Sequence, residues 1–391
     1  MEKELAAMDA LGVFEWCFLP LGSNLITCKW IFVTKWNADG SLNKYKARLV
    51  ARGFTQVHGL DYFDTFAPTV CLTAIRAMLA IANSSSMVCH SLDINTAFLH
   101  APLPEHCRCF MQAPMGYAPP ANTAGDCVRL RKALYGLKQA PREWNHTLVV
   151  FLTEHLGFTQ LFSEPSVFFK GAGDNFIAIS VHVDDQTIIS RSLPPVISLK
   201  QSLADRFGID DLGETTYTLG LEVERDSASG TLLLSQRKFI ATILERFSKY
   251  VPPPCSIPMD PTAGAALSMQ QSPDTKFARD AMAAFPYRQL IGSLMYLMVA
   301  TRPDLAFSLS KLSKFNNSPG RAHWEAACKV LGYLRQTAAV GLLYTREAPF
   351  HVQGVCDAAF ACHIDDRRSQ GGYVFMMGGA AISWKSDGAR V

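Results

Sequence analysis

Two adjacent aspartates, Asp184 and Asp185, lie between two apolar, strand-like runs. Successive side chains of a strand point to opposite faces. The alternation predicts a core face and a second face that suits a cleft: Ile177, Ile179, Val181 and Val183 on the first, and Ala178, Ser180, His182 and Asp184 on the second. Two carboxylates at a hairpin tip repel each other unless a cation neutralises them. The pair therefore predicts a Mg²⁺ site of the kind used in phosphoryl or nucleotidyl transfer, and a solvated Asp-Asp turn is the simpler alternative.

A third carboxylate, Asp93, ends another strand-like run at residues 87–93, on its less apolar side. If this strand neighbours the Asp184 strand in one sheet, the carboxylates come close enough to share two metal ions. If the strands are neighbours, Asp93, Asp184 and Asp185 would form a catalytic site for Mg²⁺ or Mn²⁺, but the sequence alone does not establish that pairing.

A basic β-hairpin is predicted at residues 25–52, with turn chemistry at residues 37–40. Between residues 35 and 52 it carries a cluster of basic residues opposed only by Asp39: Lys35, Lys44, Lys46, Arg48 and Arg52. An ordinary solvated basic face is the alternative to a surface that binds nucleic acid.

The remaining periodicity predicts helices at residues 72–82, 145–155, 199–207 and 238–247, the last capped by Ser235, and a short strand at residues 166–170. Residues 252–284 are rich in Pro, Ala and Ser, which predicts a linker without regular structure. Helices are expected again around Pro303 and Trp324, and strands from Phe350 onward.

Length and composition limit the class of protein. A chain of 391 residues with 49% hydrophobic and 18% charged residues predicts two or three globular units. The formal net charge of +3 is too small to indicate a nucleic-acid-binding protein by itself. The 11 cysteines form no CxxC pair, which favours reduced thiols in an intracellular protein over structural zinc. No signal peptide or long apolar run is present, so secretion and a membrane span are disfavoured.

Ordered sequence blocks surround the aspartates. They lie at residues 29–32, 45–56, 61–68, 91–99, 133–145, 182–185, 211–214, 217–222, 287–304 and 323–324. Together they resemble the reverse transcriptase region of Ty1/copia-type retrotransposon polyproteins, over nearly the whole chain. An unrelated metal-dependent phosphotransferase would require these blocks to be coincidence.

The resemblance implies an α+β fold of the right-hand polymerase type. Fingers, a palm with an antiparallel sheet and a thumb would occupy residues 1–250. A linker and helical connection would follow at residues 251–349, and a truncated ribonuclease H-like segment at residues 350–391. The implied activity is RNA-directed DNA polymerisation, in which deoxynucleoside triphosphates extend a DNA primer on an RNA template. A cytoplasmic particle or the nucleus is the implied location, and the sequence does not indicate an oligomeric state.

The resemblance also assigns roles to individual residues. The incoming nucleotide would be bound by Lys46, Arg48, Phe98, Tyr135 and Gly136, with Phe98 excluding a ribose 2′-hydroxyl. Template and primer would be contacted by Lys138, Gln139, Leu219 and Gly220.

Two departures from the family pattern stand out. His182 replaces a common Tyr beside the aspartate pair, and a charged imidazole would alter the site. In the ribonuclease H-like segment, the family often reads Asp-Ala-Asp-Trp-Ala-Gly-Asp where residues 357–363 read Asp-Ala-Ala-Phe-Ala-Cys-His. Asp357 alone cannot assemble a two-metal centre, so no ribonuclease H activity is expected. The alternative for the whole chain is an inactive relic, a polyprotein fragment or decayed copy, that folds and binds nucleic acid.

Overall fold

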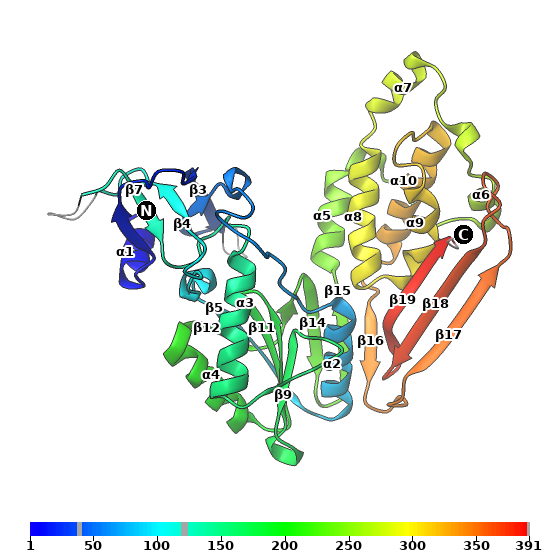
Figure 1. Ribbon diagram of the computed structural model, residues 1–391. Helices are drawn as coiled ribbons and strands as arrows, with labels where there is room; N and C mark the ends of the chain where they lie inside the picture. Colours follow the sequence, from blue (N-terminus) through cyan, green and yellow to red (C-terminus); the bar gives the residue numbers. More distant parts are fainter. Residues whose placement is uncertain (37–40, 119–123, 389–391) are drawn as a thin grey trace. The chain divides into compact units, whose positions relative to one another are not determined.

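The computed structural model describes residues 1–36, 41–118 and 124–388 (Figure 1). The predicted turn at residues 37–40 and the side chain of Lys35 lie outside the described residues. The chain folds into two compact units: unit 1 is Met1–Val70 with His90–Gly213, and unit 2 is Cys71–Cys89 with Glu214–Val391. Both contain helices and sheets, which confirms the α+β class. The functional division at residues 250 and 349 stays a prediction.

Unit 1 is built on a six-stranded sheet that contains the strands of the predicted metal site. Its order is β12 (Ile209–Glu214), β5 (Val88–Ile94), β11 (Asp185–Ser190), β10 (Ile177–His182), β9 (Val167–Lys170) and β8 (Thr159–Gln160). The pairs formed by β10 with β11 and with β9 are antiparallel. The helices α3 (Ala140–Val150) and α4 (Leu193–Phe207) lie beside this sheet in Figure 1.

Strand β10 corrects one expectation, because both of its faces are buried and neither forms a cleft. Ala178 and Ser180, expected on the cleft face, are as inaccessible as Ile177 and Ile179. Strand β10 lies inside the sheet, between β9 and β11, and the hydroxyl of Ser180 donates to the carbonyl oxygen of Thr187 at 3.3 Å. Only the end of the strand reaches solvent, so the site forms at the hairpin tip.

Smaller elements complete unit 1. A four-stranded sheet has the order β1 (Phe14–Cys17), β7 (Cys127–Leu130), β6 (Phe110–Gln112) and β2 (Leu25–Ile26). The predicted basic hairpin is confirmed as β3 (Cys28–Trp36) paired antiparallel with β4 (Leu42–Ala51). The helical pieces are α1 (Glu2–Ala10), η1 (Gly53–Thr55), η2 (Ala97–His100), the π-helical turn η3 (Phe151–His155) and η4 (Gly173–Asn175).

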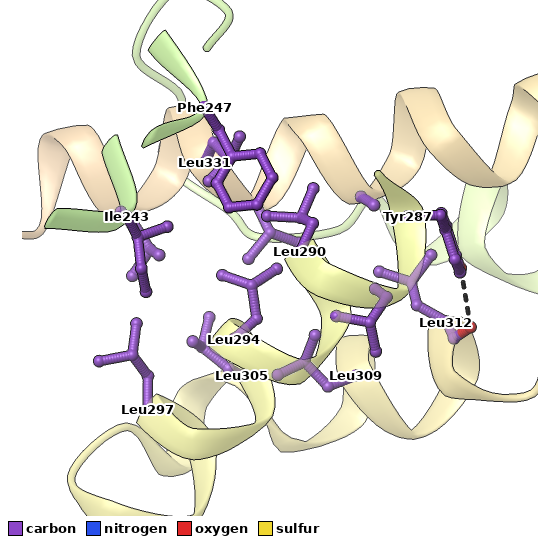
Figure 2. Packing of buried hydrophobic residues seen from close by; sticks show 14 of the residues in the cluster. Ile243, Phe247, Tyr287, Leu290, Leu294, Leu297, Leu305, Leu309, Leu312 and Leu331 are labelled. Carbon is purple, nitrogen blue, oxygen red and sulfur yellow. Dashed lines mark hydrogen bonds between the residues drawn. The ribbon is translucent and has the colours of Figure 1, made fainter. Parts of the chain in front are cut away.

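Unit 2 has an apolar core formed by its helices. Figure 2 shows leucines of α8 (Tyr287–Ala300) and α9 (Ala306–Ser313) packed together, with the Tyr287 hydroxyl donating to the carbonyl oxygen of Leu312 at 2.7 Å. The other helices are α2 (Leu72–Ser84), α5 (Arg237–Arg246), η5 (Ser248–Tyr250), α6 (Pro261–Ala265), η6 (Met269–Gln271), α7 (Lys276–Ala283), η7 (Pro303–Leu305) and α10 (Arg321–Gln336).

Unit 2 also contains two sheets. One has the order β13 (Tyr217–Thr218), β14 (Leu221–Asp226), β15 (Thr231–Ser235) and β16 (Leu342–Thr345). The other has the order β17 (Gln353–Ala359), β18 (Gln370–Met377) and β19 (Ala380–Gly388). Every residue of β17 is exposed, and β17 pairs only with β18 among the residues that the structure describes. Strand β17 is therefore an exposed edge of this sheet.

Arg76 ties α2 to the end of the chain within unit 2. Its side chain is buried and donates to the carbonyl oxygens of Ile382 at 2.7 Å and of Val299 and Ala300 at 2.9 Å. The guanidinium also lies 4.1 Å from the centre of the Trp384 ring. Residues more than 300 positions apart therefore share one buried cluster.

Three local predictions were wrong. Ser235 is the last residue of β15 and not the cap of α5, whose first residue follows Gln236. The segment at residues 252–284 is not a structureless linker, because it contains α6, η6 and α7. Thr275 caps α7 by accepting from the backbone N–H of Ala278 at 3.2 Å. Helices α3 and α4 begin before the predicted starts, each with Pro in its first turn.

No described helix is both long enough and apolar enough to cross a bilayer. All eleven cysteines are free thiols.

Candidate active site

The Asp184–Asp185 pair lies at the tip of the β10–β11 hairpin in unit 1. His182 pairs with Asp185 in the antiparallel register, which leaves Val183 and Asp184 as a two-residue turn. The backbone of Val183 has φ of +60°. A β-branched residue in the left-handed region is strained by about 1–3 kcal/mol, and such strain persists only where neighbouring groups hold it.

Trp144 on α3 is one of the groups that hold this turn. Its indole Nε1 donates to the carbonyl oxygen of Val183 at 2.7 Å, and the amide of Gln186 donates to the same oxygen at 3.3 Å. Trp144 is buried and meets the ring of Phe207 edge to face, with 5.2 Å between centroids. The hairpin tip is therefore fixed by a rigid, buried donor.

Asp93 lies beside the same tip because β5 and β11 are neighbours in the sheet. The backbone N–H of Ile94 donates to the carbonyl oxygen of Asp184 at 2.9 Å. Burial, followed by the charges of Asp184 and Asp185, raises the pKa of Asp93 to about 6. The three predicted carboxylates thus share one electrostatic environment.

Asp185 is exposed, yet its pKa is also raised, by partial desolvation and by the charge of Asp184. The charge of His182 acts in the opposite direction and lowers the pKa of Asp185. The residue at position 182 therefore does influence the site, as its departure from the family pattern suggested.

The donor set suits a divalent cation. Mutual repulsion of carboxylates is relieved by a metal ion, and Mg²⁺ prefers one or two carboxylates with phosphate oxygens and water completing its shell. Across the residues that the structure describes, no group of three or more His, Cys, Asp or Glu side chains forms a ready-made metal site. Asp93, Asp184 and Asp185 supply oxygen donors of the type that Mg²⁺ prefers, without forming a complete site on their own.

A fourth carboxylate, Asp210 on β12, was missed by the sequence reasoning. Its charge also raises the pKa of Asp93, and its Oδ1 accepts from the amide of Asn95 at 3.3 Å. Its neighbour Asp211 is instead paired with Lys200. A second Asp-Asp pair in the sequence was the available signal, although a pair alone cannot tell which member reaches the site.

Two predicted nucleotide-binding residues on β4 act on the same region. The charge of Lys46 lowers the pKa of Asp93. The Arg48 guanidinium lies 5.2 Å from the centre of the Tyr135 ring, which meets Phe98 edge to face at 5.3 Å. Burial raises the pKa of Tyr135 to about 12. The structure therefore brings Lys46, Arg48, Phe98 and Tyr135 together near the carboxylates.

Glycine is required at position 136 because the backbone there lies close to the backbone at the end of β4. Its φ is +89°, and a Cβ there would lie 2.1 Å from the carbonyl oxygen of Ala51 at the end of β4. The backbone N–H of Ala51 donates to the carbonyl oxygen of Tyr135 at 2.8 Å. Residues 135–136 are thus locked to the basic hairpin.

Lys138 and Gln139, predicted to contact template and primer, differ in exposure. Lys138 is exposed, and its Nζ donates to the Tyr62 hydroxyl at 3.1 Å. Gln139 is buried: its amide nitrogen donates to the carbonyl oxygen of Asp61 at 3.0 Å and its amide oxygen accepts from Gln56 at 2.9 Å. A direct contact of Gln139 with template stays a prediction.

The other predicted residues belong to unit 2. Leu219 and Gly220, with φ of +48° and +82°, form the turn between β13 and β14. The Tyr296 hydroxyl donates to the carbonyl oxygen of Leu219 at 3.3 Å and lies where a Cβ on Gly220 would be. Asp357 is exposed on β17, and its Oδ1 accepts from the backbone N–H of Ala358 at 2.8 Å.

Comparison with known proteins gives one family and several relatives. The family model described as reverse transcriptase (RNA-dependent DNA polymerase) matches residues 12–261. A retrovirus-related Pol polyprotein from transposon TNT 1-94 of Nicotiana tabacum is 38% identical over 387 residues, which cover 99% of this chain and 29% of the relative. The Pol polyprotein from transposon RE1 of Arabidopsis thaliana is 36% identical, over 96% of this chain and 25% of the relative.

A shorter relative is matched over most of its length. A putative transposon Ty5-1 protein of Saccharomyces cerevisiae is 31% identical over 301 residues, which cover 75% of this chain and 92% of that protein. Among solved structures, a foamy viral protease-reverse transcriptase in complex with double-stranded DNA aligns with a TM-score of 0.46 and 12% identity, over 97% of this chain and 54% of that one. The chain spans about a quarter of the length of the two plant polyproteins.

Proposed function

We propose, for a chain that belongs to the reverse transcriptase (RNA-dependent DNA polymerase) family, that unit 1 extends a DNA primer on an RNA template by two-metal-ion nucleotidyl transfer. The observation that carries the proposal is the convergence of Asp93 with the strained Asp184–Asp185 hairpin tip. Carboxylates that raise one another's pKa, beside basic side chains, suit a substrate that brings both phosphate and metal.

Each carboxylate has a proposed part in this reaction. Asp93 and Asp184 would hold the metal ions, and Asp185 would complete the set at the exposed side of the tip. Mg²⁺ or Mn²⁺, when bound, supplies Lewis-acid stabilisation of the phosphoryl oxygens and lowers the pKa of the primer 3′-hydroxyl. The Trp144 hydrogen bond orients the peptide that precedes Asp184, so the aspartate pair is positioned before substrate arrives.

The surrounding residues would bind the deoxynucleoside triphosphate. Lys46 and Arg48 neutralise its phosphate charge. The Phe98 ring, held against Tyr135, would narrow the space beside the sugar and so disfavour a ribose 2′-hydroxyl. Gly136 keeps the Tyr135 loop against β4, and exposed Lys138 would reach the template or primer backbone.

The finer architecture is proposed on the same basis. The β3–β4 hairpin would act as fingers and the six-stranded sheet as palm. The segment after residue 214 would form the thumb, with the Leu219–Gly220 turn supporting the primer end. Asp357 is the sole acidic residue at the matching positions of the ribonuclease H-like segment, so no ribonuclease H activity is proposed.

A primer-extension assay on the full chain tests the proposal. The protein is incubated with an RNA template, a DNA primer and deoxynucleotides, with Mg²⁺ or Mn²⁺. We expect incorporation by the wild type and a loss of roughly two orders of magnitude or more in Asp93→Asn and Asp184→Asn. Asp174→Asn, an exposed carboxylate before β10, is the matched control and should retain activity.

Two outcomes would contradict this function. Equal incorporation by the wild type and Asp184→Asn would remove the carboxylates from the mechanism. Salt-sensitive binding of template-primer without incorporation under any metal condition would identify the chain as a nucleic-acid-binding relic.

A further inference from the structure

Two lysines and one histidine converge within unit 2, apart from the candidate active site. Lys311 lies on α9, Lys314 follows that helix, and His363 lies between β17 and β18. Lys311 Nζ is 3.2 Å from His363 Nδ1. Lys314 Nζ is 2.7 Å from the same nitrogen and 3.1 Å from Nε2.

This basic cluster, Lys311, Lys314 and His363, cannot satisfy itself. A neutral imidazole has one acceptor nitrogen, so it can accept a hydrogen bond from only one of the two ammonium groups. A protonated imidazole would accept none. Lys311 and His363 are 6% and 4% exposed, so water cannot fully solvate the remaining charge. A buried cation without an acceptor destabilises the folded state.

Among the described residues, no carboxylate forms an ion pair with the lysines of this cluster. None of the ion pairs found among the described residues involves Lys311 or Lys314. Asp366 is the carboxylate whose charge reaches Lys314 and His363, but it is exposed and lies 3.4 Å from Arg368 Nε. Burial lowers the pKa of both Lys314 and His363, as expected where positive charge is not compensated.

The side chain at position 363 decides whether the cluster contains a negative charge. A carboxylate at that position could accept from both lysines at once. In this chain an imidazole occupies its place, and the two ammonium groups remain.

We propose that the basic cluster of Lys311, Lys314 and His363 binds an oxyanion of the phosphate class. Such an anion offers several acceptor oxygens and can take hydrogen bonds from both lysines and from the imidazole N–H. Lys314 is exposed, so the anion reaches the cluster from solvent along that side chain. The charge of exposed Arg368 in the same loop also acts on Lys314, and the charge of Asp366 acts in the opposite direction. The source is either free phosphate or a phosphate of a nucleic-acid backbone.

Thermal unfolding of the full chain tests this site. We compare sodium phosphate with sodium chloride at the same ionic strength and pH. The wild type should gain roughly 2–4 °C in Tm from phosphate. In His363→Asp the new carboxylate supplies the negative charge. This variant should therefore have a higher Tm than the wild type in chloride and gain nothing further from phosphate. His363→Asn has the same size as the Asp variant without its charge, and it should keep the phosphate response.

Lys314→Met provides a second measurement that does not depend on the loop folding correctly around a new residue. Removing one exposed ammonium should raise the Tm in chloride and weaken the response to phosphate. A short DNA duplex in place of phosphate separates the two sources. A gain in Tm that is lost specifically in His363→Asp would assign the anion to the backbone of nucleic acid.

The proposal is overturned by either of two results. One is an equal phosphate effect on the wild type and His363→Asp, which would place anion binding elsewhere. The other is no specific effect of phosphate or duplex on the wild type. Neither result bears on Asp93, Asp184 and Asp185, so the function proposed for unit 1 is tested separately.

Discussion

The indole of Trp144 donates a 2.7 Å hydrogen bond to the carbonyl oxygen of Val183, the residue that precedes the Asp184–Asp185 pair. Val183 has a left-handed backbone that is unfavourable for its branched side chain. The peptide group that Trp144 binds therefore sets where the two carboxylates point. Trp144 is a positioning residue, because its indole donates to the turn and its ring packs against Phe207.

Trp144→Phe tests this relationship because it keeps an aromatic ring and removes the donor. We expect kcat for primer extension to fall about 10- to 100-fold with little change in KM for the nucleotide, since small displacements of reacting groups are costly. Stability should fall by only about 1–2 kcal/mol. Mn²⁺ affinity, measured by the paramagnetic resonance signal of free Mn²⁺, should weaken in parallel.

The matched control is Trp16→Phe, the same substitution on β1, in a different sheet. It should leave both kcat and Mn²⁺ affinity near the wild-type values. If Trp144→Phe lost stability but kept kcat and Mn²⁺ affinity, the hydrogen bond would be structural only.

The pH dependence of stability should report the crowding of the carboxylates. In the folded chain the pKa of Asp93 is raised from 3.8 to about 6. The folded state therefore holds this proton more tightly than the unfolded chain, and the free energy of unfolding should fall as pH rises from about 4 to about 6. After allowance for solvent screening, the loss should be about 1–2 kcal/mol and should persist above pH 6.

Chemical unfolding in a metal chelator, repeated between pH 4 and 7, measures this effect. Asp93→Asn removes the titrating group, so its stability should match the wild type near pH 4 and exceed it at pH 7. Asp174→Asn, which is far from the hairpin tip in the sheet register, should follow the wild-type curve. Parallel curves for the wild type and Asp93→Asn would refute the raised pKa.

Gly136→Ala should show how tightly the Tyr135 loop is held against β4. The new Cβ would lie 2.1 Å from the carbonyl oxygen of Ala51, at a backbone with φ of +89°. We expect a loss of about 3 kcal/mol or more, because backbone atoms must move. Gly59→Ala is the control: its φ is +80° but nothing lies within 4 Å of the new Cβ. It should cost only about 1–2 kcal/mol.

Denaturant titration of both variants separates the two causes of instability. A similar loss in Gly136→Ala and Gly59→Ala would mean that backbone strain alone matters and that the loop can shift away from β4.

Local sequence patterns predicted the elements of the site well. Alternating apolar residues indicated β10, and the Asp-Asp pair was expected at its end. What alternation could not reveal is which strands are neighbours, because strand order depends on contacts between distant segments. Asp93 was therefore expected near Asp184 only if their two strands were neighbours in one sheet. Asp210 was missed.

Burial was the other quantity that the pattern could not provide. Alternation implies a solvent-exposed face only when one side of a sheet is left uncovered. Strand β10 lies between two other strands, and both of its faces are buried. Similarly, Gln139 was expected at the nucleic acid because of its block, whereas its amide is committed to Gln56 and Asp61. Polar residues in a motif can form hydrogen bonds that stabilise the fold as readily as they bind a ligand.

The cluster around Arg76 has a consequence for the order in which this protein can fold during its synthesis. Its buried guanidinium finds its acceptors on residues 299–300 and 382, so α2 is synthesised long before the groups that complete it exist. Until those residues emerge during translation the Arg76 side chain stays solvated by water, and it can be buried only when they are present. A fragment that ends at residue 250 would lack these acceptors, so its α2 would be without the hydrogen bonds that Arg76 makes in the full chain.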